Sequence, residues 1–180
     1  MHKLVTEYFK IGKIVAAHGL KGELILKHVL GKKTSLKGLQ ALFIEDKKNS
    51  FLPWFIQSAK IKSNEEIILI LEGIDVREAA IKLTQKEVWL PENDFKKFVA
   101  KSSPINLLGF HIIDNNKDLG PILELIEQPH QLLARLEING KEVLVSLAEN
   151  FIKKIDKKNR QVLVSLPEGF LEIYLGPGYI

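Results

Sequence analysis

The amino-acid sequence predicts an all-β protein built from two small β-barrels joined by a linker. Short apolar runs of strand-like composition recur along most of the 180 residues, and turn-forming residues separate them. Strands at this spacing are typical of barrels and sandwiches. Only one segment, near residues 75–84, repeats apolar residues at the three-and-four spacing of a helix face. A polar segment at residues 93–104 divides the strands into two series, one for each domain.

The first series contains six expected strands and the one helix. The strands are expected at residues 10–17, 22–29, 41–46, 51–62, 65–73 and 87–91. Residues 67–71 (IILIL) lack charge and are expected to be buried on both faces. Pro53 favours a strand edge or a bulge, because it has no N–H to donate. Asp75 is the expected N-cap of the helix, and Glu78 completes a capping-box-like pair with it.

A second series of strands follows the polar segment. These strands are expected at residues 107–114, 119–128, 132–138, 141–147, 151–156 and 160–167. Asn139 and Gly140 form the dipeptide favoured in two-residue hairpins, because both positions tolerate positive φ. The assignments predict four parts: a first domain at residues 1–92, a linker at residues 93–104, a second domain at residues 105–175 and a tail at residues 176–180.

Composition excludes several classes of chemistry. The chain has no cysteine, which excludes disulfides, thiolate catalysis and Cys-ligated metal. Its five histidines show no metal-binding spacing such as HExxH, so no metal site is expected. The N-terminal residues do not resemble a signal peptide, and the longest apolar runs are far shorter than the roughly 20 residues that cross a bilayer. We therefore expect a soluble cytoplasmic protein.

Positive charge is concentrated in the first third of the chain. Residues 1–62 contain 12 Lys and 4 Asp or Glu, a net charge of +8. Residues 63–180 contain 14 Lys or Arg and 18 Asp or Glu, a net charge of −4. This asymmetry indicates an anionic partner, for which RNA is the leading candidate, and the alternative is a solvated lysine surface.

The segment IVAAHGLKGELIL places His18, Gly19, Lys21 and Gly22 between two apolar strands. It is not a phosphate-binding loop of the Walker type, because a strand-like segment follows where that loop needs a helix. It is predicted to be a tight turn at a barrel rim, where Gly19 and Gly22 allow backbone conformations that other residues resist. His18 has three open roles: a hydrogen bond within the turn, a donor presented to RNA or another partner, or catalysis. Lys21 is expected to face solvent, where it can contact a phosphate.

A long basic loop is expected after the second strand. Lys27 precedes it, and residues 30–38 contain Lys32, Lys33 and Lys37. A mobile loop of this kind can follow a phosphate backbone, and such binding weakens steeply as salt rises. The strand expected at residues 51–62 contains three aromatic residues, Phe51, Trp54 and Phe55. They are expected to pack into the core rather than stack on bases.

Several segments resemble the RimM family of ribosome maturation factors. Residues 12–26 resemble its N-terminal signature, G-x-I-x-x-x-H-G-x-x-G-E, and residues 72–91 resemble its Gly-x-x-x-Arg-x-x-Ala helix with the strand that follows. Residues 107–127 resemble the start of its second, PRC-barrel domain. The later segments are similar to the remainder of that domain, so the resemblance covers nearly the whole chain in order. The signature matches at Gly12, Ile14, His18, Gly19, Gly22 and Glu23.

This resemblance implies both a fold and a function. The first domain would be a barrel of the kind found in elongation factors and reductases. The protein would bind the immature small ribosomal subunit and assist assembly of its head and processing of 16S rRNA, without chemistry, cofactor or membrane, and as a monomer. It would do so by contacting nearby rRNA and ribosomal protein nineteen of the small subunit. The RNA contacts are expected at His18, Lys21, Lys27, Lys32, Lys33 and Lys37.

Contact with the ribosomal protein is expected near the end of the linker. The family often has paired tyrosines just before the second domain, and here aromatic residues other than tyrosine stand in that segment. The residues expected to make the contact are Phe95, Phe98, Leu107 and Leu108.

Two other functions remain open on the sequence alone. The chain could be a PRC-type adaptor that binds only proteins and makes no RNA contact. It could instead be an enzyme that uses His18 as an acid or base in a barrel cleft, since barrels of the first kind also occur in oxidoreductases. Salt-dependent RNA affinity separates the first alternative from the leading one, and replacement of His18 tests the second.

Overall fold

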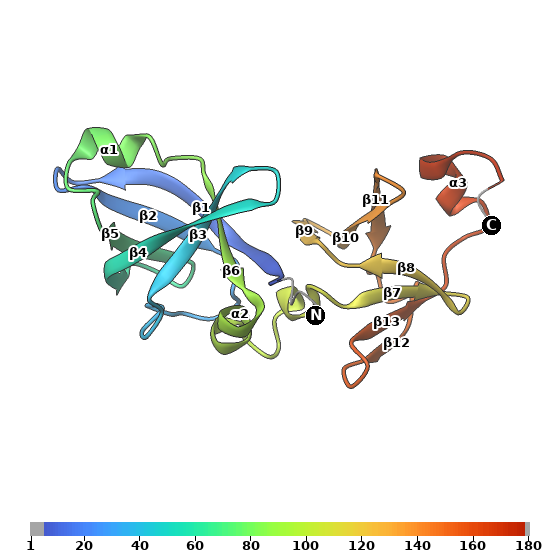
Figure 1. Ribbon diagram of the computed structural model, residues 1–180. Coiled ribbons are helices and arrows are strands. Elements are labelled where there is room, and N and C mark those ends of the chain that lie inside the picture. Colours follow the sequence, from blue (N-terminus) through green and yellow to red (C-terminus); the bar gives the residue numbers. More distant parts are fainter. Residues whose placement is uncertain (1–5, 179–180) are drawn as a thin grey trace, which may run out of the picture. The chain divides into compact units, whose positions relative to one another are not determined.

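A computed structural model describes residues 6–178 (Figure 1). Residues 1–5, at the start of the expected first domain, and residues 179–180, at the end of the expected tail, lie outside the described part of the chain. The chain divides into two compact units between Asn106 and Leu107. The all-β prediction with two units is confirmed.

The first unit is a closed barrel of six strands in the order β1-β2-β5-β4-β3-β6 (Figure 1). Each strand pairs antiparallel with both of its neighbours. All six strands predicted in this part of the chain are present. They are β1 (Tyr8–His18), β2 (Glu23–His28), β3 (Ala41–Lys47), β4 (Ser50–Ile61), β5 (Glu66–Leu71) and β6 (Glu87–Pro91).

The barrel core is made by every second residue of its strands. In β5, Ile67, Leu69 and Leu71 are completely buried, whereas Ile68 and Ile70 are only partly buried. The prediction that this run is buried on both faces was wrong, because a barrel strand turns only one face to the interior. Other completely buried core residues include Ile11, Ile14, Leu24, Leu26, Leu42, Val88 and Leu90.

Gly12 allows β1 to approach β2 closely. A Cβ atom on Gly12 would lie 2.1 Å from the carbonyl oxygen of Lys27, far inside van der Waals contact. On the opposite edge of β1, Gly12 is paired with Val88 of β6. The register of β1 shifts just before Gly12 in its pairing with β6 and shortly after it, between Ile14 and Ala16, in its pairing with β2. Such bulges bend a strand and increase its twist, which helps to close the barrel.

Pro53 lies in β4 where that strand has a single neighbour. It stands opposite Phe43 of β3, whereas pairing of β4 with β5 begins only at Ile56. The missing N–H of Pro53 therefore breaks no ladder. This agrees with the expected edge position.

An aromatic cluster covers the outer surface of the barrel beside this part of β4. Phe43 of β3 is paired with Trp89 of β6. The adjacent pair, Ile44 and Val88, is buried in the core. Because successive side chains of a strand point to opposite faces, Phe43 and Trp89 point outward. Phe51 stacks on Tyr8 with ring centroids 4.4 Å apart and meets Trp89 at 5.1 Å. The expectation of core packing was therefore wrong for Phe51, which packs on the outside. It was also wrong for Phe55, which is 52% exposed, and Trp54 is partly buried.

Within residues 6–178, three α-helices and one 3-10 helix accompany the strands, and the sequence predicted only the first of them. Helix α1 (Arg77–Ile81) has Val76 as its N-cap and no side-chain capping bond, so the expected capping pair of Asp75 and Glu78 is absent. The peptide before the helix is held instead by a backbone contact with Gly22. The others are α2 (Glu92–Phe98), η1 (Pro104–Leu107) and α3 (Phe170–Leu175).

Helix α2 occupies half of the expected linker and belongs to the first unit. Its buried Phe95 packs on Phe9 of β1, with ring centroids 5.0 Å apart. Acidic residues lie in its first turn and basic residues in its last, which complements the helix dipole. The sequence does contain a signal for this helix, because the same charge order accompanies apolar residues at helical spacing, namely Phe95, Phe98 and Val99.

The second unit contains two sheets, in the orders β11-β10-β9 and β12-β13-β7-β8. Strand β13 pairs parallel with β7, and β8 of one sheet lies against β10 of the other. The expected strand at residues 119–128 is divided between the sheets, and Asn139 and Gly140 form the expected turn with positive φ. The strands are β7 (His111–Asp114), β8 (Lys117–Pro121), β9 (Glu124–Gln128), β10 (Gln131–Ile138), β11 (Lys141–Ser146), β12 (Ile152–Asp156) and β13 (Gln161–Val164).

His28, the last residue of β2, is buried in the first unit with 1% of its surface exposed. The N–H of Leu30 donates to its Nδ1 at 3.4 Å, which places the ring proton on Nε2. Within residues 6–178 this Nε2 has no hydrogen-bond partner. Burial lowers the pKa of His28, because the charged ring would lose its hydration, and the negative charge of Glu65 opposes the shift only in part.

We predict that the free energy of unfolding falls as the pH drops below about 6.5, the usual pKa of histidine. Below that pH the unfolded chain takes up a proton that folded His28 does not, so protonation favours unfolding; above it the effect is absent. Urea unfolding at about pH 7.5 and about pH 5 measures this loss. A His28→Asn variant keeps an acceptor but cannot be protonated, and should lose less stability between the two pH values. Equal losses in both proteins would contradict the prediction.

Candidate functional site

The turn between β1 and β2 forms one end of the barrel. His18 and Glu23 are the last pair of the β1–β2 ladder, and residues 19–22 connect them. Gly19 and Gly22 both have positive φ, +63° and +77°. A Cβ on Gly22 would lie 2.0 Å from the carbonyl oxygen of Ile74, so only glycine fits at this contact. The turn is thus packed against the backbone that leads into α1.

Arg77 of α1 fixes the other side of the turn. Its Nη1 donates a hydrogen bond to the carbonyl oxygen of Gly19 at 2.8 Å. Sequence reasoning did not assign Arg77 to the site, although the Gly-x-x-x-Arg-x-x-Ala pattern from Gly73 to Ala80 was the available signal. A single segment, more than fifty residues later in the sequence, therefore holds the turn in place.

The side chains of the turn point outward. His18 and Lys21 are exposed, and neither side chain makes a hydrogen bond or ion pair with any residue between 6 and 178. Leu20 is 81% exposed, and α1 adds exposed apolar groups at its two ends. We call this set the turn surface. Its members are His18, Leu20, Lys21, Val76, Arg77 and Ile81.

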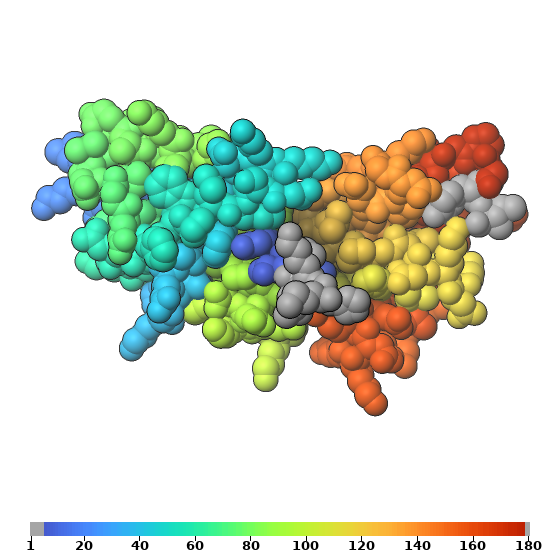
Figure 2. Space-filling model, in the orientation of Figure 1, coloured from blue at the N-terminus to red at the C-terminus, as the bar shows by residue number. Residues whose placement is uncertain are grey.

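The basic loop lies at the other end of β2. It was expected to be mobile, but Leu30 and Leu36 are buried and anchor it to the first unit. Lys32, Lys33 and Lys37 are exposed between and beside these anchors. Figure 2 shows side chains of this lighter-blue segment projecting from the surface.

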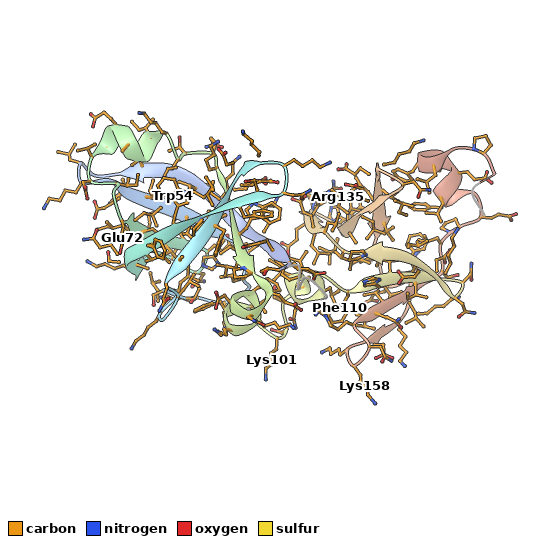
Figure 3. All side chains as sticks on the ribbon, viewed as in Figure 1. Trp54, Glu72, Lys101, Phe110, Arg135 and Lys158 are labelled. Atoms are coloured by element: carbon orange, nitrogen blue, oxygen red, sulfur yellow. The ribbon has the colours of Figure 1, made fainter. Side chains whose placement is uncertain are left out.

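A second segment adds a lysine to the loop that the sequence did not assign. The N–H of Ala100 donates to the carbonyl oxygen of Leu30 at 2.8 Å, and Gly31 lies against Ser103. Lys101, between these contacts, is exposed and points away from the ribbon in Figure 3. We call the combined set the loop-end surface: Lys27, Lys32, Lys33, Lys37 and Lys101.

The structure does not bring the expected RNA-binding residues together into one patch. Strand β2 begins at Glu23, beside the turn surface, and ends at His28, beside the loop-end surface. At about 3.4 Å per residue the strand separates the two surfaces by roughly 17 Å. His18 and Lys21 therefore belong to one surface, and the four other expected lysines belong to the other.

His18 belongs to no candidate metal-binding group among the described residues. Among residues 6–178 no group of three or more His, Asp or Glu side chains could hold a metal ion. Within the same residues, no helix is long and apolar enough to cross a membrane. The chemistry available at both surfaces is that of solvent-facing cations and apolar side chains, which suits binding.

Comparison with known proteins decides the family. Residues 9–95 match the model of the RimM N-terminal domain, and residues 104–170 match the model of the RimM PRC barrel domain. A ribosome maturation factor RimM from Christiangramia forsetii is 30% identical and covers 94% of this chain and 98% of its own length. The chain belongs to the RimM family.

Other RimM proteins agree over a similar length. The ribosome maturation factor RimM of Oleidesulfovibrio alaskensis is 31% identical over 95% of this chain and 98% of its own length. That of Azobacteroides pseudotrichonymphae is 30% identical over 85% of this chain and 90% of its own length. The family predicted from the signature at residues 12–26 is thus confirmed, and the turn surface lies within the RimM N-terminal domain.

The residues expected to contact a protein partner in this RimM chain differ in accessibility. Phe95 is 3% exposed and Leu108 is 2% exposed, so their side chains are used in packing. Phe98 and Leu107 are partly buried and keep some accessible surface. Of the four expected contacts, only these two can touch a partner without rearrangement.

We predict that Gly22→Ala destabilises this RimM protein more than Gly73→Ala does. Both glycines have φ +77°, so both variants share the cost of positive φ, about 1–2 kcal/mol. Only at Gly22 would the new Cβ meet backbone atoms, whereas nothing lies within 4 Å at Gly73. The clash should add at least about 1 kcal/mol, as overpacking does elsewhere. Urea unfolding of the two variants measures the difference, and equal losses would show that the turn is not held against Ile74.

Proposed function

We propose that this chain is a non-enzymatic ribosome maturation factor that binds the immature small ribosomal subunit. It would assist assembly of the subunit head and processing of 16S rRNA by contacting rRNA and ribosomal protein nineteen of the small subunit. It would work in the cytoplasm, as a monomer and without a cofactor. One observation carries the proposal: both RimM domain models match in order, and relatives named ribosome maturation factor RimM align over 94% and 95% of the chain.

The loop-end surface supports RNA as one partner. Its five lysine side chains make no ion pair with residues 6–178, whereas the neighbouring Lys96 and Lys97 are paired with Glu92 and Asp94. Unpaired lysines on an anchored loop present several point charges at nearly fixed spacing. Such charges suit contact with phosphates, and they carry no sequence preference of their own.

The turn surface supports a second contact of mixed character. Lys21 supplies a cation and His18 a ring nitrogen, while Leu20, Val76 and Ile81 supply exposed apolar area. Because Arg77 and Gly22 hold the turn, little conformational entropy remains to be lost when a partner binds there. His18 and Lys21 therefore stay in the proposal as RNA contacts. Phe98 and Leu107 stay as contacts with the ribosomal protein.

We predict that the full-length protein captures immature small subunits in preference to mature ones. Immature subunits expose rRNA and ribosomal-protein surface that is closed or differently arranged after maturation, so the fit should be lost. Pull-down with each population, followed by quantification of 16S rRNA, measures the ratio. Equal capture of both populations would contradict a role in maturation.

We predict that Lys32→Ala/Lys33→Ala weakens binding to RNA and makes it less salt-dependent. Each lost phosphate contact should reduce the slope of log affinity against log salt by about 1. Lys47→Ala/Lys48→Ala is the matched control, since these adjacent exposed lysines directly follow two acidic residues, Glu45 and Asp46, which balance their charge. If the wild-type protein captures immature subunits but shows no salt-dependent affinity for RNA, the proposed RNA contact would be wrong, and the protein would bind the subunit through ribosomal proteins alone.

A further inference from the structure

The basic residues of the second unit are concentrated in one short segment. Residues 107–180 contain eight basic and ten acidic residues, and five of the eight basic residues lie between positions 153 and 160. Only one acid, Asp156, lies in that segment, and the other nine lie elsewhere in the unit. A unit of net negative charge thus carries a strongly positive segment of eight residues.

This segment forms the hairpin of β12 and β13 (Figure 1). Strand β12 is the outermost strand of its sheet, and its pairing ends at Asp156 opposite Gln161. Residues 157–160 turn the chain between the strands. Lys158 lies at the tip and points away from the ribbon in Figure 3.

The turn is held rigid by the acid and the arginine of the segment. Asp156 accepts hydrogen bonds from the backbone N–H of Asn159 at 3.0 Å and from its Nδ2 at 3.1 Å. Arg160 donates to the carbonyl oxygen of Leu108, and its guanidinium lies 5.6 Å from the ring centroid of Phe110, which ties the turn to the rest of the unit. These two charges serve the fold, so the surrounding lysines carry the free positive charge.

Three of the lysines have no partner in the described chain. The side chains of Lys153, Lys157 and Lys158 are exposed and make no hydrogen bond or ion pair with residues 6–178, whereas Nζ of Lys154 lies 3.4 Å from Oδ2 of Asp156. Lysines on an edge strand commonly prevent edge-to-edge aggregation, and that role accounts for Lys153 and Lys154. It does not account for Lys157 and Lys158, which lie beyond the paired part of the hairpin.

We propose that the β12–β13 hairpin is a second RNA-binding element, which contacts the phosphate backbone through Lys153, Lys157 and Lys158. A protein partner fits this surface less well. Protein interfaces are centred on apolar and aromatic groups and are depleted of lysine, and the exposed large apolar residue of the hairpin is Ile155, at 40%. A narrow projecting hairpin with lysines at its tip suits contact with phosphates beside a groove or loop of RNA. The inference rests on the proposed function only in taking RNA as the partner.

The chain supplies a closely matched control for this hairpin. The sequence Asp156-Lys157-Lys158-Asn159 recurs as Asp46-Lys47-Lys48-Asn49, where β3 turns into β4. Glu45 precedes that second copy, so its two lysines are balanced by two acids. The same substitutions therefore act on the same four-residue sequence in both hairpins, and the charge of the surrounding residues differs.

The experiment compares the full-length wild type with Lys157→Ala/Lys158→Ala and Lys47→Ala/Lys48→Ala. Each protein is titrated into a fluorescently labelled RNA stem–loop, and anisotropy is recorded between about 50 mM and about 200 mM salt. Loss of two phosphate contacts should reduce the salt slope of the first variant by about 2. Over this fourfold rise in salt, the factor by which affinity falls should be roughly sixteen times smaller for the variant than for the wild type. The control should keep the wild-type slope. A Lys157→Glu/Lys158→Glu variant should bind more weakly still.

The outcomes separate this inference from the proposed function. If wild type binds the stem–loop and captures immature subunits while Lys157→Ala/Lys158→Ala matches it in slope and affinity, the hairpin inference alone is overturned. If the variant keeps its RNA affinity but loses capture of ribosomal protein nineteen, the hairpin is a protein contact and the inference is again overturned. Unchanged thermal unfolding of the variants shows that the exposed substitutions leave the fold intact.

Discussion

Closure of the barrel depends on the close approach of β1 to β2 at Gly12. There β1 has strands on both sides, and a Cβ would meet the Lys27 carbonyl oxygen at 2.1 Å. Because the barrel closes, each strand has one inward and one outward face, and the two ends of β2 lie at opposite ends of the barrel. The turn surface and the loop-end surface owe their separation to this constraint.

Ion pairing separates the lysines of the loop-end surface from neighbouring lysines of the same unit. Lys62, Lys96 and Lys97 are neutralised by neighbouring acids, whereas the lysines of the loop-end surface are not. The same distinction explains how a unit with more acids than bases can hold a positive hairpin. Charges on a surface are screened over about 8 Å at physiological ionic strength, so a phosphate at the hairpin tip responds mainly to the nearest lysines. The net charge of the whole second unit therefore does not reveal the positive charge of the β12–β13 hairpin.

Alternation and turn residues were enough to locate the barrel strands, because a half-buried strand must repeat every two residues. They failed where contacts distant in sequence decide the outcome. Helix α2 is stabilised by the packing of Phe95 on Phe9, which lies at the other end of the unit in sequence. Helix α1 begins after Val76 and not after Asp75, and Gly22, more than fifty residues earlier, packs against the peptide before it. The strand expected at residues 119–128 divides after Pro121, since its two halves serve different sheets.

The sequence by itself determined the family, the two-unit all-β organisation and the signature turn with its glycines, because these depend on local pattern and composition. It also identified five of the six lysines of the turn surface and the loop-end surface. Only the tertiary structure decided which of them lie together. It placed Lys101 beside the basic loop, separated Lys21 from that loop, buried Phe95 and assigned Arg77 to the turn. The physical reason is that grouping of side chains on a surface is set by strand register and by backbone contacts across long sequence separations, which no local pattern encodes.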